Sequence, residues 1–355
     1  MIGFSAQSGP IGLDIGLKSL AAFQVRWAGG RAIAAAAVIV DRHHAKDHAP
    51  FSADEAEQLE QVLYRQGFHG REIVLAVPDQ HLLSGVLELP PRASGAPLEQ
   101  IARMEIARAH KRDPASFEMA CWDIPPPARG GEFTYVMASA CTHEASIPLL
   151  DTLESTGFRV TALDTRPWAL TRACGPRLAP TGLSAVLDAG ESGALMTVVH
   201  KGVPVYERLM PEAGLRRLRA RIQSELSLEP EVADYVLSAA MRALAGPASG
   251  SGRSVEQQAG NLLEEHIHGL LTEVQNAVEY IAHRYATRVE NLLLTGSAAG
   301  ARGLVERLGS GLNLSASVVT PAELMECPPA LQGACGTPRL AAALGLALPG
   351  SRRAA

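Results

Sequence analysis

Two short segments of the sequence place an aspartate and a glycine directly after an apolar run. Residues 12–25 read GLDIGLKSLAAFQV, and residues 186–199 read VLDAGESGALMTVV. In both, apolar residues flank the aspartate, which predicts a strand ending at the carboxylate, a tight turn and a returning strand. Backbone N–H groups of such a turn can bind phosphate, and the carboxylate can hold the water shell of a metal ion. Because Asp-x-Gly also occurs in ordinary hairpins, neither turn alone identifies a ligand.

The repetition of this turn about half a chain later indicates an internal duplication. The layout resembles the actin-like nucleotide-binding fold, in which two such turns hold the phosphates of a nucleotide from both sides of a cleft. Residues 291–304 (NLLLTGSAAGARGL) supply the third element of that layout, a strand whose small-residue end contacts the adenosine. The predicted nucleotide-binding residues are Asp14, Gly16, Leu17, Lys18, Ser19, Asp188, Gly190, Glu191, Ser192, Gly296, Ser297 and Ala298. Bound ATP is expected to require Mg²⁺, held through water by Asp14 and Asp188.

The elements that must position these turns predict an α/β protein with two lobes. We expect the first lobe at residues 1–80 and 159–180, with a strand–helix–strand–strand–helix subdomain inserted at 81–158. We expect the second lobe at 181–355, with a smaller subdomain around 202–285. That subdomain contains a helix with several arginines and the longest helix, at 256–285, whose apolar stripe is typical of core.

Composition excludes several classes of function. The 32 basic residues against 37 acidic ones give a net charge of −5, and no basic stripe interleaved with aromatics is present, so we expect no nucleic-acid partner. The five cysteines are scattered without a C-x-x-C pair. This pattern favours a reducing compartment and argues against a zinc site. The longest apolar runs, at 32–40 and 340–348, are far shorter than the roughly 20 residues of a membrane span. We therefore expect a cytoplasmic protein that reaches a membrane only through a partner.

Two polar stretches allow more than one interpretation. The histidines at 43, 44 and 48 could bind a metal, but they are better explained as a solvated loop because no acidic or thiol ligand lies nearby. Residues 245–254 (AGPASGSGRS) have the composition of a flexible loop.

Several strings, taken in order, resemble the PilM family of type IV pilus assembly proteins, relatives of the cell-division protein FtsA in the actin-like superfamily. Besides the two turns, they are IVLAVPD at 73–79 with LELP at 87–90, then GFRV at 157–160 with Asp164 and PWALTR at 167–172, and finally LLTG at 293–296. The resemblance covers roughly residues 10–350. It implies an actin-like pair of lobes in which residues 81–158 are the subdomain that PilM and FtsA insert into the first lobe.

The resemblance also implies a role. PilM proteins bind ATP at the inner face of the inner membrane, where they capture the short cytoplasmic tail of PilN, a single-pass membrane protein. They also connect to other proteins of the pilus platform. We therefore expect a scaffold of a type IV pilus or a related type II secretion system. The tail is expected in the seam where the inserted subdomain rejoins the first sheet, at Phe158 to Leu163.

The sequence departs from the family pattern at the nucleotide motifs. Leu17 stands where relatives usually have Ser or Thr, Pro211-Glu212 stands where Gly-Gly is usual, and Gly296 alone remains of two or three consecutive glycines. Arg166 stands where an acid is frequent. Each lost contact could cost about 1 kcal/mol. These departures predict a weak nucleotide binder or a degenerate pocket. Asp79 is expected to lie outside the cleft.

Two other functions fit the same fold. An active ATPase or a sugar kinase would need a carboxylate base for the acceptor, and Asp164 is the only candidate by its place in the chain. An FtsA-like filament former would need a membrane anchor, and residues 351–355 (SRRAA) do not form an amphipathic helix.

Overall fold

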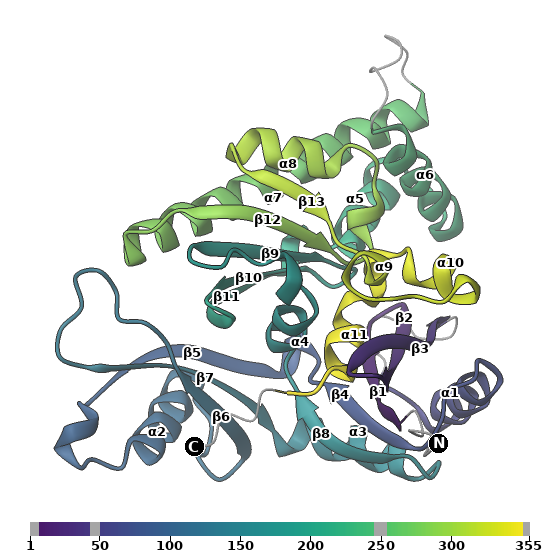
Figure 1. Ribbon diagram of the computed structural model, residues 1–355. Helices are drawn as coiled ribbons and strands as arrows, with labels where there is room; N and C mark the ends of the chain where they lie inside the picture. The colour runs from purple at the N-terminus through teal and green to yellow at the C-terminus, as the bar shows by residue number, and fades with distance from the viewer. Residues whose placement is uncertain (1–6, 43–49, 245–253, 351–355) are drawn as a thin grey trace.

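The structure is a computed structural model that describes residues 7–42, 50–244 and 254–350. The histidines at 43, 44 and 48, nearly all of the expected loop at 245–254 and the tail at 351–355 lie outside the described residues. Within them, two five-stranded sheets and one three-stranded sheet are arranged as two lobes and an inserted module (Figure 1).

The first lobe is built on a sheet of order β3-β2-β1-β4-β8. The first three strands form an antiparallel meander, whereas β4 and β8 run parallel to β1. Their bounds are β1 Gln7–Ile15, β2 Ser19–Ala28, β3 Arg31–Asp41, β4 Glu72–Ala76 and β8 Arg159–Asp164. The carboxyl ends of β1, β4 and β8 therefore meet at one edge of the sheet.

The second lobe repeats this sheet with the order β11-β10-β9-β12-β13. Here β10 and β11 continue antiparallel from β9, and β12 and β13 run parallel to it, so each strand has a counterpart in the first sheet. The bounds are β9 Leu183–Ala189, β10 Ala194–His200, β11 Val203–Met210, β12 Val289–Thr295 and β13 Ser315–Val318. The matching orders and directions confirm the predicted duplication and the actin-like fold.

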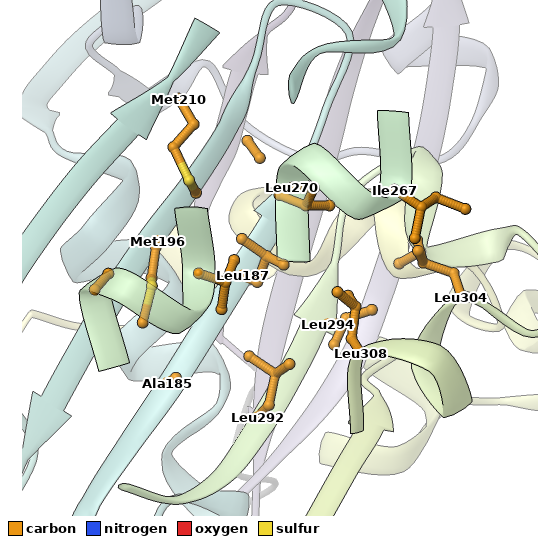
Figure 2. Close-up of a cluster of buried hydrophobic side chains, with 14 of the residues drawn as sticks. Ala185, Leu187, Met196, Met210, Ile267, Leu270, Leu292, Leu294, Leu304 and Leu308 are labelled. Atoms are coloured by element: carbon orange, nitrogen blue, oxygen red, sulfur yellow. The ribbon is translucent and has the colours of Figure 1, made fainter. Parts of the chain in front are cut away.

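Four helices cover the outer face of the second sheet (Figure 1). They are α5 Leu215–Glu225, α6 Pro230–Ala243, α7 Val255–Tyr285 and α8 Leu304–Leu312. The predicted apolar stripe of α7 is buried, and Ile267 and Leu270 pack with strand residues such as Leu187 and Leu294 (Figure 2). Helix α6 was not predicted, although Pro230 at its start and the spacing of its buried residues signal it.

Opposite faces of the first sheet pack against different helices. Leu20 and Ala22 of β2 share a core with α1 (Ala53–Arg65) and α3 (His143–Glu154). Ala21 and Phe23, which point the other way, pack against α11 (Ala341–Ala347). The capping box that the sequence contains at Ser52 and Glu55 starts α1.

Helices α4 (Arg166–Ala173) and α11 lie between the two sheets (Figure 1). A Cβ on Gly345 of α11 would lie 1.8 Å from the carbonyl oxygen of Ala169, so only glycine permits this contact with α4. Leu170 of α4 packs with Val186 and Leu293 of the second sheet. The short helices α9 (Pro321–Leu324) and α10 (Gln332–Cys335) complete this region.

The inserted module is a sheet of order β5-β7-β6 packed against α2 (Leu98–His110). Its strands are β5 Leu82–Leu89, β6 Phe117–Asp123 and β7 Thr134–Thr142. The module also packs on the second lobe, because Tyr135 and Met137 belong to that lobe's core. In addition, the Trp122 indole donates to the carbonyl of Pro204 at 2.9 Å. No helix within the described ranges is long and apolar enough to cross a bilayer.

Candidate functional site

A cavity of about 800 Å³ lies between the lobes and is called the cleft here. This volume falls in the usual range of ligand pockets, roughly 300–1,000 Å³. Every predicted nucleotide-binding residue except Ala298 lines it: Asp14, Gly16, Leu17, Lys18, Ser19, Asp188, Gly190, Glu191, Ser192, Gly296 and Ser297. The fold thus brings together three segments that are far apart in the chain.

Four charged side chains converge at the base of the cleft, and we call them the floor. Asp14 ends β1, Asp79 follows β4, Arg166 follows β8 and Asp188 ends β9. Because β1, β4 and β8 are parallel, their carboxyl ends bring Asp14, Asp79 and Arg166 together. Asp188 reaches the same point from the second sheet.

The Arg166 guanidinium lies among the three carboxylates of the floor. Its Nη2 is 2.8 Å from Asp14 Oδ1, and its Nη1 is 2.8 Å from Asp79 Oδ2 and 3.5 Å from Asp188 Oδ2. All four side chains are between 10% and 13% exposed, so water screens these charges little. Asp79 does not line the cleft, as predicted, but Arg166 ties it to the two aspartates that do.

Burial dominates the electrostatics of the floor. It raises the pKa of Asp79 to about 6 against the attraction of Arg166, and Asp14 and Asp188 raise it further. Burial likewise raises the pKa of Asp188, while Arg166 and a hydrogen bond from Thr295 at 3.0 Å oppose the rise. Burial alone would lower the pKa of Arg166, but the three carboxylates raise it well above its usual value, so the guanidinium stays charged.

The residues present do not fit a magnesium ion between Asp14 and Asp188. The guanidinium of Arg166 already bonds to both carboxylates. Within the described ranges, no group of three or more His, Cys, Asp or Glu side chains is arranged to hold a metal ion. Asp79 Oδ1 and Arg166 Nε, both buried, have no hydrogen-bond partner among the described residues. A cation placed beside the guanidinium would meet its positive charge at short range.

Hydrogen bonds within the turn and from Arg42 support the first turn. Gly16 N donates to the carbonyl of Ser19 at 2.9 Å, which closes the turn. Arg42, after β3, donates to the carbonyl of Gly16 at 3.0 Å and forms a buried ion pair with Glu55 at 2.6 Å. Glu55, which completes the capping box of α1, thereby also holds the arginine that supports the turn.

Side chains of the first turn contact the opposite side of the cleft. Lys18 Nζ lies 3.1 Å from Asp234 Oδ2 on α6, across the cleft. Arg339, just before α11, donates to Ser19 Oγ at 2.9 Å and lies 3.8 Å from Asp41. Lys18 and Ser19, two of the predicted nucleotide-binding residues, thus have polar partners within the protein.

The second turn is docked on the start of α5. The carbonyls of Gly190 and Glu191 accept the backbone N–H groups of Leu215 and Arg216 at 3.1 and 3.0 Å. Arg219 of α5 pairs with Glu191 at 3.1 Å and also with Asp234. We call the ion pairs of Lys18, Arg219 and Arg339 the rim of the cleft.

The third predicted element supports the floor directly. Thr295 Oγ1, at the end of β12, donates to Asp188 Oδ1 at 3.0 Å. Gly296 follows with φ +88°, and a Cβ there would lie 2.6 Å from Asp188 Oδ1. The single glycine that remains of this motif is therefore required by its contact with the floor.

A second cavity of about 530 Å³, the junction cavity, lies where the inserted module joins the first lobe. Helix α3 supplies one wall, with Ala145 and Leu149, and the first turn and residues 78–81 supply another. Residues 158–163, where the sequence places the tail, do not line the junction cavity: Phe158 lines a different cavity beside α1, and β8 is the edge strand of its sheet. Gly16, Leu17, Arg42, Arg166 and Ser192 line both the cleft and the junction cavity.

Asp164, the candidate base of a kinase, lies away from the cleft. Its carboxylate pairs with Arg172 and accepts the backbone N–H of Thr165 at 2.7 Å, and it does not line the cleft. The floor residues Asp79 and Arg166 were missed as a pair by sequence reasoning. Their signal was present, since each follows a strand predicted for the first sheet.

Comparisons with known proteins agree with this geometry. The family described as "Type IV pilus assembly protein PilM" matches residues 12–351. A solved structure titled "PilM-PilN type IV pilus biogenesis complex" is similar with a TM-score of 0.78 and 21% identity, over 96% of this chain and 97% of that one. The ethanolamine utilization protein EutJ from Carboxydothermus hydrogenoformans is similar with a TM-score of 0.56 and 15% identity, over 98% and 91%. The search of curated proteins gave no match. Since the family match spans nearly the whole chain, the protein belongs to the PilM family of type IV pilus assembly proteins.

Proposed function

We propose that this protein is an actin-like scaffold of the inner-membrane assembly platform of a type IV pilus, or of a related type II secretion system. It works at the cytoplasmic face of that membrane by binding the cytoplasmic tail of a PilN-like membrane protein and contacting other platform proteins. The observation that carries the proposal is family membership together with the likeness to a chain solved as a PilM–PilN complex.

The junction cavity is the proposed site of the tail. Seams between subdomains are preferred ligand sites, and this one combines apolar residues such as Phe51 and Leu149 with charged residues such as Arg112 and Glu144. An extended peptide could place apolar side chains against the former and be oriented by the latter. The cavity therefore offers both affinity and direction to a short tail.

Nucleotide binding is secondary to partner binding in this proposed function. The volume of the cleft and the placement of the two turns suit a nucleotide, but the cations of the rim are already paired with carboxylates of the same cavity. A phosphate would have to displace those pairs, and each exchange lowers the net gain from binding. We infer weak ATP binding or a degenerate pocket.

A peptide-binding measurement tests the scaffold proposal. The probe is a fluorescent peptide with the cytoplasmic-tail sequence of a PilN-like protein, titrated against the full chain. Ala145→Arg should reduce its affinity by about tenfold or more, because the long side chain fills part of the junction cavity. Deleting the whole module is less informative, since Tyr135 and Met137 belong to the second-lobe core.

The matched control is Ile147→Arg. Ile147 lies on the same helix, is 50% exposed and does not line the junction cavity, so this variant should bind the peptide normally. Equal affinity of both variants and the wild type would remove the tail from this cavity. No binding by the wild type would remove the proposed partner.

A further inference from the structure

We propose that the Arg166 guanidinium is the resident cation of this cleft: it occupies the place where Asp14 and Asp188 would otherwise hold a divalent metal ion, so that the cleft takes its ligand without metal. The inference concerns the cleft alone and does not depend on the partner proposed above.

The geometry of the floor supports this exclusion. A hard divalent ion, or its water shell, would need the carboxylate oxygens that now accept hydrogen bonds from Arg166. Those oxygens come from both lobes, at 2.8 Å for Asp14 and 3.5 Å for Asp188. A metal ion could enter only after the guanidinium had left, because two cations within a few ångströms repel strongly among side chains that are only 10–13% exposed.

The backbone of Arg166 is fixed, which limits such a departure. Arg166 is the first residue of α4, whose cap Thr165 accepts the backbone N–H of Trp168 through its side chain. Trp168 in turn packs edge-to-face on Trp122 of the inserted module, with ring centroids 5.2 Å apart. Rotation of the side chain away from the floor would leave three buried carboxylates facing one another without a counter-charge.

The substitution also changes the charge of the site. A guanidinium supplies one positive charge where a magnesium ion would supply two, so the floor with its three carboxylates is left more negative. The remaining described cations that line the cleft at its rim already pair with Asp234, Glu191 and Asp41. A phosphate-bearing ligand would therefore exchange with rim pairs and would gain nothing from added magnesium.

Binding of Mn²⁺ alone, followed by electron paramagnetic resonance of the free ion, tests the proposal. The wild type should show no Mn²⁺ site that depends on the floor. Arg166→Gln should gain one site, with an affinity about tenfold or more above the wild type, because three carboxylates then lack a cation. Mn²⁺ should also raise the melting temperature of this variant and not of the wild type. The double variant Arg166→Gln/Asp188→Asn should lose most of the gain.

The matched control is Arg172→Gln, which removes an arginine from the same helix whose partner Asp164 lies outside the floor. It should gain no Mn²⁺ site. A folded Arg166→Gln protein without Mn²⁺ binding would overturn the proposal, and so would a Mn²⁺ site in the wild type that Asp188→Asn removes. If Arg166→Gln does not fold, the wild type decides: no site supports the proposal, and a site lost in Asp188→Asn overturns it. Neither result changes the peptide titration, so the two proposals fail separately.

Discussion

The floor and the rim of the cleft use the same chemistry in different surroundings. Both consist of arginine or lysine paired with carboxylates, and each contains one pair that joins the two lobes: Arg166 with Asp188 in the floor and Lys18 with Asp234 in the rim. The floor is buried, with side chains 10–13% exposed, whereas Lys18 and Asp234 at the rim are 42% and 45% exposed. The rim is itself mixed, because Arg219 and Glu191 are only 14% and 19% exposed. We therefore expect the floor pairs to contribute to stability and the exposed Lys18–Asp234 pair to exchange with solvent or a ligand.

The largest effect should come from unpairing the floor. Arg166→Leu should lower the free energy of unfolding by about 3–5 kcal/mol at pH 7, because it leaves three buried carboxylates without a counter-charge. The deficit should shrink at pH 5, below the pKa of about 6 that Asp79 has even beside Arg166. Urea unfolding at both pH values measures it.

Arg208→Leu provides the exposed counterpart. Arg208 pairs with Glu273, and both side chains are 43% exposed, so its loss should cost no more than about 1 kcal/mol. Similar losses for Arg208→Leu and Arg166→Leu would erase the distinction between buried and exposed pairs.

A smaller effect of opposite sign should follow from neutralising Asp79. Its pKa is about 6 in the folded protein against 3.8 ordinarily, so the folded state binds its proton more tightly than the unfolded state does. Its contribution to stability is therefore lost as the pH rises from about 4 to about 6. Asp79→Asn, which cannot ionise, should stabilise the protein by about 1–3 kcal/mol at pH 7 and by almost nothing at pH 4.

Chemical denaturation across this pH range measures the effect of Asp79→Asn. Asp151→Asn, at an exposed position of α3, is the control and should change the stability by no more than about 0.5 kcal/mol. Destabilisation by Asp79→Asn at pH 7 would mean that attraction to Arg166 outweighs burial at this carboxylate.

The smallest effect should come from the rim. A double-mutant cycle of Lys18→Ala and Asp234→Ala should give a coupling energy of about 0.2–1 kcal/mol that falls as salt is added. A coupling energy above about 2 kcal/mol that is insensitive to salt would mean that this pair behaves like the buried ion pairs of the floor.

The sequence was sufficient to predict the duplicated frame. Each Asp-x-Gly turn is a local pattern between two apolar strands, and the folded structure usually keeps the conformation that such a local pattern favours. The strands before Asp14 and Asp188 therefore end where predicted, and all but Ala298 of the predicted residues line one cavity. The family strings added the order of the later elements, which periodicity alone does not give.

The strand ends indicate that Asp14, Asp79 and Arg166 lie near one edge of the sheet, but their pairing into one ion cluster depends on how the strands are registered in space and could not be predicted from such patterns. Arg166 is 152 residues from Asp14 along the chain, and only the parallel pairing of β1, β4 and β8 brings them together. The position of the junction cavity could not be predicted for the same reason. Residues 158–163 rejoin the sheet at its outer edge, while the cavity forms beside α3 and the first turn.

The wall shared by the cleft and the junction cavity has a thermodynamic consequence. Gly16, Leu17 and Arg166 face both spaces, so an occupant that shifts them on one side changes the shape of the other. Linkage requires such an influence to be mutual: if a ligand in the cleft changes the affinity for a peptide by some factor, the peptide changes the affinity for that ligand by the same factor. Binding in the cleft and binding in the junction cavity can therefore be coupled through these shared residues without any movement of the lobes.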